Sequence, residues 1–188
     1  MEGYLDRVMR LARQLGARRF EAQGLEMQAR LCLDTGRRAE AEAMLREALA
    51  ICREAGTQFC GPKVTSALSR AVEDSAERQN LLTEGRTMLA RGAVAHNHLW
   101  FYRDAIESRL SSGDAEGALE YVSALEDYTR AEPLLWADVS AARGRALAAG
   151  LRGATNEAHR GELLRVRSAL ETAGLAAFLP RVDAALAK

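Results

Sequence analysis

The residues best suited to chemistry in this sequence are two histidines, His96 and His98, separated by one residue. Imidazole is a common zinc ligand, and zinc sites usually need four ligands. Residues two apart on a helix face in different directions, and no cysteine, histidine or carboxylate stands nearby in the sequence to complete the set. The two rings could still converge in the turn before a helix. The spacing nevertheless favours capping or packing, and we predict no metal site.

Paired carboxylates and paired hydroxyls are the other groups that could supply catalysis. They are Glu73-Asp74, Glu126-Asp127, Thr65-Ser66 and Ser111-Ser112. Neighbouring carboxylates diverge on a helix and are typical of solvated surfaces or caps, while the hydroxyls have no histidine at a motif spacing to activate them. Neither Lys63 nor Lys188, the only lysines, follows a G-x-x-x-x-G-K-[ST] loop. We therefore predict no catalytic residue and no cofactor.

The three cysteines, Cys32, Cys52 and Cys60, have spacings of 20 and 8 that match no metal or redox motif. Cys32 and Cys52 fall on apolar helical faces, where a thiol behaves as a small hydrophobe; a redox role is the less favoured alternative. The N-terminus lacks the layout of a signal peptide, and no run of 18 apolar residues occurs. We expect a cytoplasmic protein that does not enter a membrane.

The charge balance argues against nucleic acid as a partner. The 188 residues include 26 basic and 26 acidic ones, giving a formal net charge of zero, whereas nucleic-acid binders usually carry a basic excess. Basic stretches such as Arg37-Arg38 lie beside Glu40 and Glu42, which indicates a charge-mixed helix face. With 48% hydrophobic residues, the chain has the composition of a folded domain.

The elements that must position any site are predicted to be helices. Ala, Leu, Arg and Glu dominate, only three prolines occur, and period-two runs of β-branched residues are absent. Glycines and capping residues divide the chain into ten segments: 2–15, 17–35, 38–55, 61–74, 75–92, 97–112, 114–130, 133–150, 155–173 and 175–187. We expect Ser75 to start the fifth segment, and Asn97 and Asp114 to cap the sixth and seventh. Pro133 should lie in the first turn of the eighth, and Pro180 should kink or delay the last. Short turns favour antiparallel neighbours. We expect one all-α domain, 1–188, built as stacked helical hairpins or, alternatively, as a closed bundle.

Two stretches share one pattern of small and large residues around a turn glycine. The first comprises Leu25, Ala29, Cys32, Gly36, Ala41, Leu45 and Ala48, and the second Tyr102, Ala105 or Ile106, Gly113, Ala118, Val122 and Leu125. In the first stretch, both the residues before the glycine and those after it fall at i, i+4 and i+7, which is one helix face. Gly36 and Gly113 are 77 residues apart, or two units of about 38.

This pattern resembles the tetratricopeptide repeat, with a period longer than the 34 residues typical of that family. The resemblance implies an α-α superhelix of antiparallel hairpins whose end units need caps. Residues Leu175 to Lys188 place several apolar side chains on one side. We predict that this last segment, 175–188, is the C-terminal capping helix.

A closer resemblance rests on two further stretches, His96 to Glu107 and Ala124 to Pro133. They look like the C-terminal repeats of bacterial signalling proteins that carry a class III adenylate/guanylate cyclase domain and a P-loop ATPase. Transcription activators of the maltose-regulator type share this architecture more loosely. The resemblance implies a regulatory interaction region and brings no catalytic residue with it.

The densest aromatic run, Trp100-Phe101-Tyr102, contains the candidate binding residues. The repeat pattern places Tyr102 between hairpins and leaves Trp100, Arg103 and Glu107, at i, i+3 and i+7, facing water along the groove side of their helix. Trp and Arg often anchor interfaces. The alternative is that Trp100 packs on the preceding hairpin and Arg103 pairs with Glu107.

The function expected from these features is a non-catalytic scaffold. Its partner would be another protein or the upstream domains of its own parent chain. The main alternative is a small-molecule sensor of the transcription-activator type, with an apolar effector pocket near Trp100 and Trp136. A hydrolase with an unrecognised site is the least favoured alternative.

Overall fold

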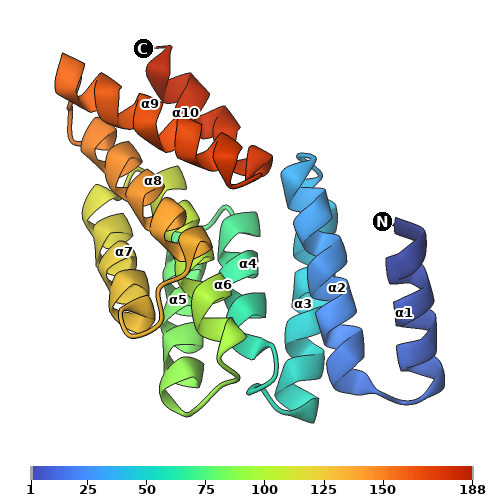
Figure 1. Ribbon diagram of the computed structural model, residues 1–188. Coiled ribbons are helices and arrows are strands. Elements are labelled where there is room, and N and C mark those ends of the chain that lie inside the picture. The colour runs from blue at the N-terminus through green and yellow to red at the C-terminus, as the bar shows by residue number, and fades with distance from the viewer. Residues whose placement is uncertain (1, 188) are drawn as a thin grey trace. The chain divides into compact units, whose positions relative to one another are not determined.

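The computed structural model describes residues 2–187, and within them it is 81% helical and contains no strand (Figure 1). The helices are α1 (Glu2–Gln14), α2 (Arg18–Asp34), α3 (Arg38–Ala55), α4 (Gly61–Ala71), α5 (Ser75–Ala90), α6 (His96–Ser111), α7 (Ala115–Thr129), α8 (Leu135–Leu151), α9 (Glu157–Thr172) and α10 (Leu179–Leu186), with a 3₁₀ turn at Ala176–Phe178. The predicted all-α class is confirmed.

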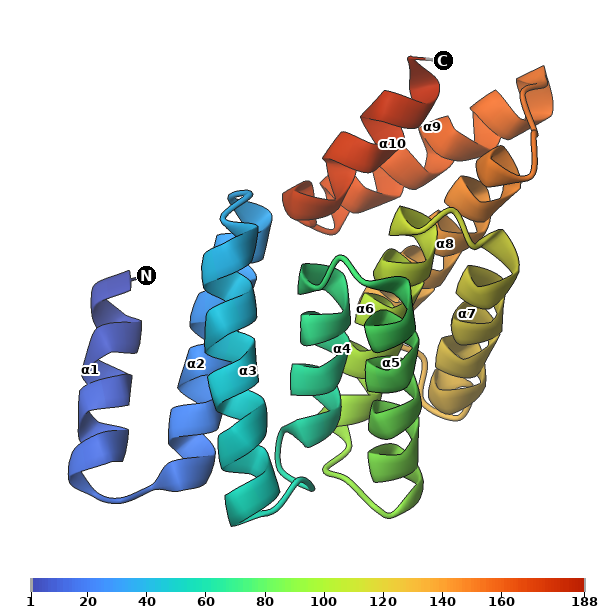
Figure 2. The ribbon, with the colours of Figure 1, turned by 180° about the vertical axis from the view of Figure 1, so that it is seen from behind.

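The chain divides into two compact units, Met1–Asp104 and Ala105–Lys188, with the division inside α6. In the first unit, α2 and α3 form one hairpin and α4 and α5 the next, while α1 packs on α2 and α3 packs on α4 (Figure 2). Consecutive helices thus pack side by side, as the short turns predicted. That residues 1–188 form a single domain stays a prediction.

The first of the two patterned stretches contributes to the core of the first unit. All six of its side chains apart from the turn glycine are buried: Leu25, Ala29, Cys32, Ala41, Leu45 and Ala48. Gly36 lies at the turn with a φ of +77°, a conformation in which a side chain would be strained. The small alanines let α2 and α3 approach closely, and Leu45 fills the space beside them.

A first prediction tests this packing. Ala41→Leu should destabilise the protein by about 1–3 kcal/mol, because Ala41 is fully buried and its site has no room for three more carbons. Ala39→Leu, two residues earlier on the exposed side of α3, is the matched control and should change stability by less than about 0.5 kcal/mol. Urea unfolding of both variants measures the difference. Equal stability of the two would show that Ala41 is not a packing position.

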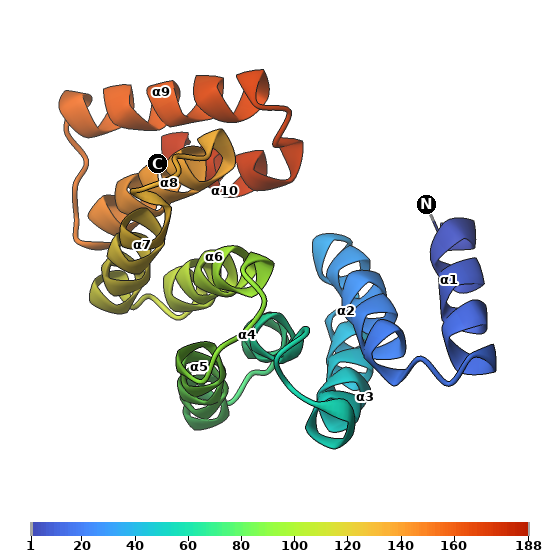
Figure 3. The same cartoon turned by 60° about the horizontal axis from the view of Figure 1, so that its bottom comes forward.

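In the second unit, α7 packs on α8, α8 on α9, and α9 on α10 (Figure 3). Close approach depends on Gly144 of α8, where an added Cβ would lie 2.7 Å from Val122 and 3.0 Å from Ile106. The predicted cap corresponds to the 3₁₀ turn and α10, which packs on α9 and α8 and buries Val182. Pro180 lies in the first turn of α10 and delays that helix, as predicted. Lys188 lies outside the described residues.

Several predicted helix starts need correction. Asp74, rather than Ser75, caps α5 by accepting a hydrogen bond of 2.6 Å from the Glu77 amide. Pro133 precedes α8, which begins two residues later. Asn97 does not cap a helix: it lies in the first turn of α6, and its amide nitrogen donates to carbonyl oxygens that include that of Phe59, 3.1 Å away. The predicted cap at Asp114 is confirmed by its 2.8 Å bond from the Gly117 amide.

The three cysteines are buried and reduced. The sulfur atoms of Cys52 and Cys60 lie 3.4 Å apart, a proximity that their sequence spacing did not indicate. The hydrogen bond with Cys60, together with burial, raises the pKa of the Cys52 thiol. Cys52 is therefore a packing residue in the reduced protein. Separately, no helix within residues 2–187 is long and apolar enough to cross a membrane.

Candidate partner-binding site

A group of charged side chains lies inside the first unit, on α2, α4 and the first turns of α6. We call it the Asp104 cluster. Its members are Glu26 and Arg30 from α2, Lys63, Ser66 and Arg70 from α4, and Trp100, Arg103 and Asp104 from α6. A packed core normally places apolar side chains in such positions, so the cluster needs its own explanation.

Asp104 is fully buried and lies between three guanidinium groups. Arg30 approaches it to 2.7 Å from α2, Arg70 donates to it from α4 at 3.2 Å, and the adjacent Arg103 donates at 2.7 Å. The hydroxyl of Ser66 lies 3.3 Å from Asp104 Oδ2. This one carboxylate therefore links three helices.

A second buried carboxylate, Glu26, lies beside the first. It accepts a hydrogen bond from Arg30 Nε, and its other oxygen lies 3.1 Å from Lys63 Nζ. Both Glu26 and Lys63 are buried. Arg30 therefore bridges the two carboxylates of the cluster.

The cluster carries more positive than negative charge. Its four basic side chains, Arg30, Lys63, Arg70 and Arg103, face two carboxylates, which leaves a surplus of two positive charges. Burial alone would raise the pKa of Asp104, but the charges of the three arginines hold it well below its usual range.

The effect of the extra positive charge is clearest in the pKa of Arg103. Burial lowers the pKa of its guanidinium, Asp104 opposes that effect, and the neighbouring charges of Arg30 and Arg70 add to it. An anion bound at the cluster would offset this repulsion, because an opposite charge favours the protonated guanidinium.

Trp100 completes the cluster with an aromatic face. The guanidinium carbons of Arg30 and Arg103 lie 4.6 and 4.4 Å from its ring centroid, within the range of cation–π attraction. Trp100 is itself half-buried. The indole thus orients two of the arginines while part of its surface remains in contact with solvent.

The predicted binding residues fall into different surroundings. Trp100 and Arg103 join the Asp104 cluster, but the prediction that Arg103 faces water is wrong, since its side chain is only 12% exposed. Glu107 belongs to the second unit, where it accepts a hydrogen bond from Arg143 and lies 3.6 Å from Arg181.

The aromatic residue between hairpins is also shifted by one position. Phe101 is fully buried, while Tyr102, which the repeat pattern placed inside, is half-buried. An added Cβ at Gly85 would collide with the Phe101 ring. The helix α5 therefore has a glycine where that ring needs space.

Sequence reasoning missed the residues that α2 and α4 contribute. A signal was present: Glu26 and Arg30 are four residues apart, and Lys63, Ser66 and Arg70 fall at i, i+3 and i+7, so each set shares one helix face. Polar residues at the spacing of a buried face are the pattern that would have indicated them.

The histidines take packing positions. His96 lies edge-on to Phe59 with centroids 6.2 Å apart, and His98 lies 6.0 Å from the Tyr102 ring. Burial lowers the pKa of both imidazoles. Among residues 2–187, no group of three or more His, Cys, Asp or Glu side chains is placed to hold a metal ion.

Fold and site together define an all-α chain whose first unit holds an ionic cluster contributed by α2, α4 and α6. Comparison of the chain with protein-family models, with curated proteins and with solved structures finds no match. The properties of the Asp104 cluster therefore form the basis for assigning a function.

Proposed function

We propose that the first unit is a non-catalytic binding domain that takes up an acidic segment of a protein through the Asp104 cluster. The observation that carries the proposal is the surplus of two positive charges around buried Asp104, next to the half-buried Trp100. Arginines form strong paired hydrogen bonds with carboxylates, and Trp and Arg are enriched among the residues that dominate binding energies.

Stability alone gives a weak reason for such a cluster. Burying charges costs several kcal/mol per ion, and replacing buried ion pairs by apolar residues is often neutral or stabilising. A function in binding accounts both for the cost and for the sign of the surplus. Arg70, whose side chain is 22% exposed, is the cluster arginine most accessible to a ligand.

Two sources of the acidic segment fit the proposal. One is a separate protein, and the other is an upstream domain of the same polypeptide, as the resemblance to the repeats of cyclase-type signalling proteins implies. Three buried, reduced cysteines fit a reducing compartment, and we place the interaction in the cytoplasm.

Photo-crosslinking of the full chain tests the proposal. A photoreactive amino acid in place of Trp100 should yield a covalent adduct with a partner protein. An excess of the same chain without the photoreactive amino acid should prevent formation of this adduct. The same amino acid in place of Tyr4, which is 72% exposed on α1 of the same unit, is the control and should not yield that adduct.

Binding of the partner so identified should then depend on the cluster. Arg70→Gln should weaken it by roughly 2 kcal/mol, or about 30-fold. The control Arg53→Gln removes an exposed arginine of α3 that pairs with Glu84 of α5, and it should leave binding unchanged. Melting curves confirm that both variants are folded. Equal affinity of the two variants would refute the assignment of the site.

A further inference from the structure

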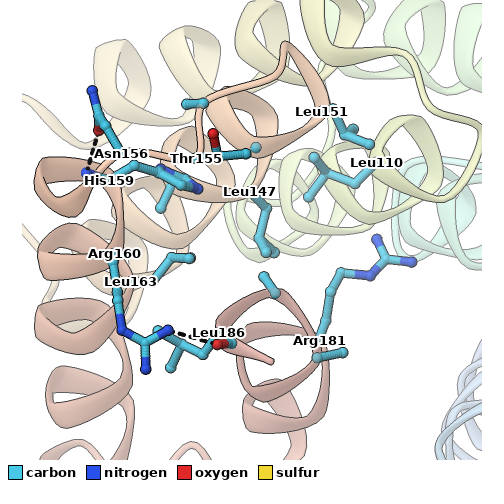
Figure 4. Close-up of a pocket in the computed structure, with 15 residues that line it drawn as sticks. Leu110, Leu147, Leu151, Thr155, Asn156, His159, Arg160, Leu163, Arg181 and Leu186 are labelled. Atoms are coloured by element: carbon cyan, nitrogen blue, oxygen red, sulfur yellow. Dashed lines mark hydrogen bonds between the residues drawn. The ribbon is translucent and has the colours of Figure 1, made fainter. Parts of the chain in front are cut away.

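The second unit contains a cavity of about 430 Å³ next to α8, α9 and α10 (Figure 4). Its apolar lining includes Leu110 from the end of α6, Leu147 from α8, Leu163 from α9 and Leu186 from α10. The volume lies in the range of about 300–1,000 Å³ that is usual for small-molecule sites. Neither Trp100 nor Trp136, where a sensor pocket was expected, lines it.

The cavity exists because small residues stand where larger ones would fill it. Ala146, Gly150 and Ala154 line it along and just beyond α8. A Cβ added at Gly150 would lie 3.3 Å from Nε2 of His159, so a larger side chain there would press on the imidazole. The chain thus leaves a space with leucine and alanine walls where a fully packed core would leave none.

The polar groups of the lining are basic or neutral. Arg160, Arg181 and His159 line the cavity together with Thr155 and Asn156, and none of its lining residues in the described part of the chain is an aspartate or glutamate. In Figure 4, Arg160 and Arg181 lie on opposite sides of the drawn lining. The two arginines do not have equal surroundings.

Arg160 is engaged at the end of a helix. Its Nη1 donates a 2.8 Å hydrogen bond to the carbonyl oxygen of Leu186, the last residue of α10 (Figure 4). The C-terminal end of a helix carries partial negative charge, which compensates part of the charge of Arg160.

Arg181 shares its carboxylate with another arginine. Glu107 accepts a hydrogen bond from Arg143 and lies 3.6 Å from Arg181, whose Nη2 also donates to the hydroxyl of Ser111 at 2.8 Å. Two guanidinium groups, those of Arg143 and Arg181, therefore contact the carboxylate of Glu107. The side chain of Arg181 is 37% exposed.

We infer that this cavity binds a small amphipathic acid, with its apolar chain against the leucines and its carboxylate beside Arg181. The leucine and alanine walls provide burial for the chain. The basic side chains of the described lining, which includes no aspartate or glutamate, select an anionic head group over a neutral or cationic one. This site goes beyond the proposed protein-binding function and involves other residues.

Isothermal titration of the full chain with three ten-carbon probes tests the inference: decanoate, decanol and decylammonium, each below its aggregation concentration. Decanoate should bind at least about tenfold more tightly than decanol, the scale of one hydrogen bond to a charged group, and decylammonium should bind most weakly. Equal binding of all three, or no binding of decanoate, would overturn the inference.

Variants locate the site. Arg181→Gln should weaken decanoate at least about tenfold while leaving decanol unchanged, and Arg181→Lys, which keeps the charge, should restore most of the affinity. Arg165→Gln, 71% exposed on α9, is the control and should bind like the parent. If Arg165→Gln and Arg181→Gln weaken decanoate equally, the contribution of Arg181 is disproved.

Filling the cavity provides a second test that does not depend on charge. Ala146→Leu and, separately, Ala185→Leu place extra carbons in the lining and should weaken decanoate and decanol together. Thermal melting establishes which of the two variants is folded. Binding to either folded variant then shows whether the ligand occupies the cavity. Unchanged binding in a folded variant would place the ligand outside this cavity.

Discussion

Asp104→Asn should destabilise the protein by about 3–5 kcal/mol, the usual cost of removing one partner from a buried ion pair. Asp104 is fully buried and compensates three guanidinium groups. An amide there would leave Arg30, Arg70 and Arg103 in mutual repulsion. For a chain of this length the loss corresponds to a fall in melting temperature of roughly 10 °C, measurable by circular dichroism.

The matched control for this substitution is Asp127→Asn. Asp127 also pairs with an arginine, Arg130, but both side chains are more than 60% exposed. Exposed pairs contribute about 0–1 kcal/mol, so the control should melt close to the parent. A melting temperature of Asp104→Asn equal to that of the control would mean that the cluster is hydrated and that its charges carry little energy.

The stabilisation of the folded protein by Asp104 should also decrease as the pH falls. The arginines lower its pKa in the folded protein, below the value of about 3.9 expected for an unfolded aspartate. Its stabilisation is therefore fully present above about pH 5 and is lost as the pH falls through 3.9 towards the folded-state pKa. The difference in unfolding free energy between parent and Asp104→Asn should narrow over that interval. A constant difference would contradict the lowered pKa.

Phe101→Ala should cost about 3–5 kcal/mol, as expected for deletion of a fully buried aromatic ring. The ring lies against Gly85 of α5 and near Thr65 of α4, so its loss leaves a cavity between helices that already approach closely. Urea unfolding provides the measurement.

Tyr102→Ala serves as the comparison because the two residues are adjacent on α6 and both aromatic. Tyr102 is only half-buried, and its removal should cost clearly less, about 1 kcal/mol. If Tyr102→Ala lowers the unfolding free energy more than Phe101→Ala does, Tyr102 is the buried aromatic residue, as the repeat pattern predicted.

The helices could be predicted because their ends depend on local chemistry. Gly36 and Gly113 both adopt a φ of +77°, which glycine tolerates better than any other residue, so their positions in the sequence mark turns directly. Alanine and leucine at i, i+4 and i+7 likewise identified the buried face of α3. Such features involve residues within a few positions of one another.

The site was only partly predictable because its contacts join distant residues. Trp100 and Arg103 could be found from the aromatic run of α6, but Arg30 is 74 residues and Arg70 34 residues from Asp104. No local pattern indicates that these charges meet. The prediction of Tyr102 instead of Phe101 as the buried residue has another cause. Successive residues of a helix point about 100° apart, so a pattern matched one position off selects the wrong side chain.

The contact of Asp104 with Arg30, a residue distant in the sequence, should also affect how the first unit unfolds. In repeat proteins each unit usually contacts only its nearest neighbours, so that end units can fray independently. Here Arg30 of α2 donates to the carboxylate of Asp104 in α6, so that the contact passes the hairpin formed by α4 and α5. Opening either end separates oppositely charged groups in a medium of low polarity, where their attraction is strong. We therefore expect the segment from α2 to the first turns of α6 to unfold as one cooperative unit, longer than the nearest-neighbour contacts of its helices would produce.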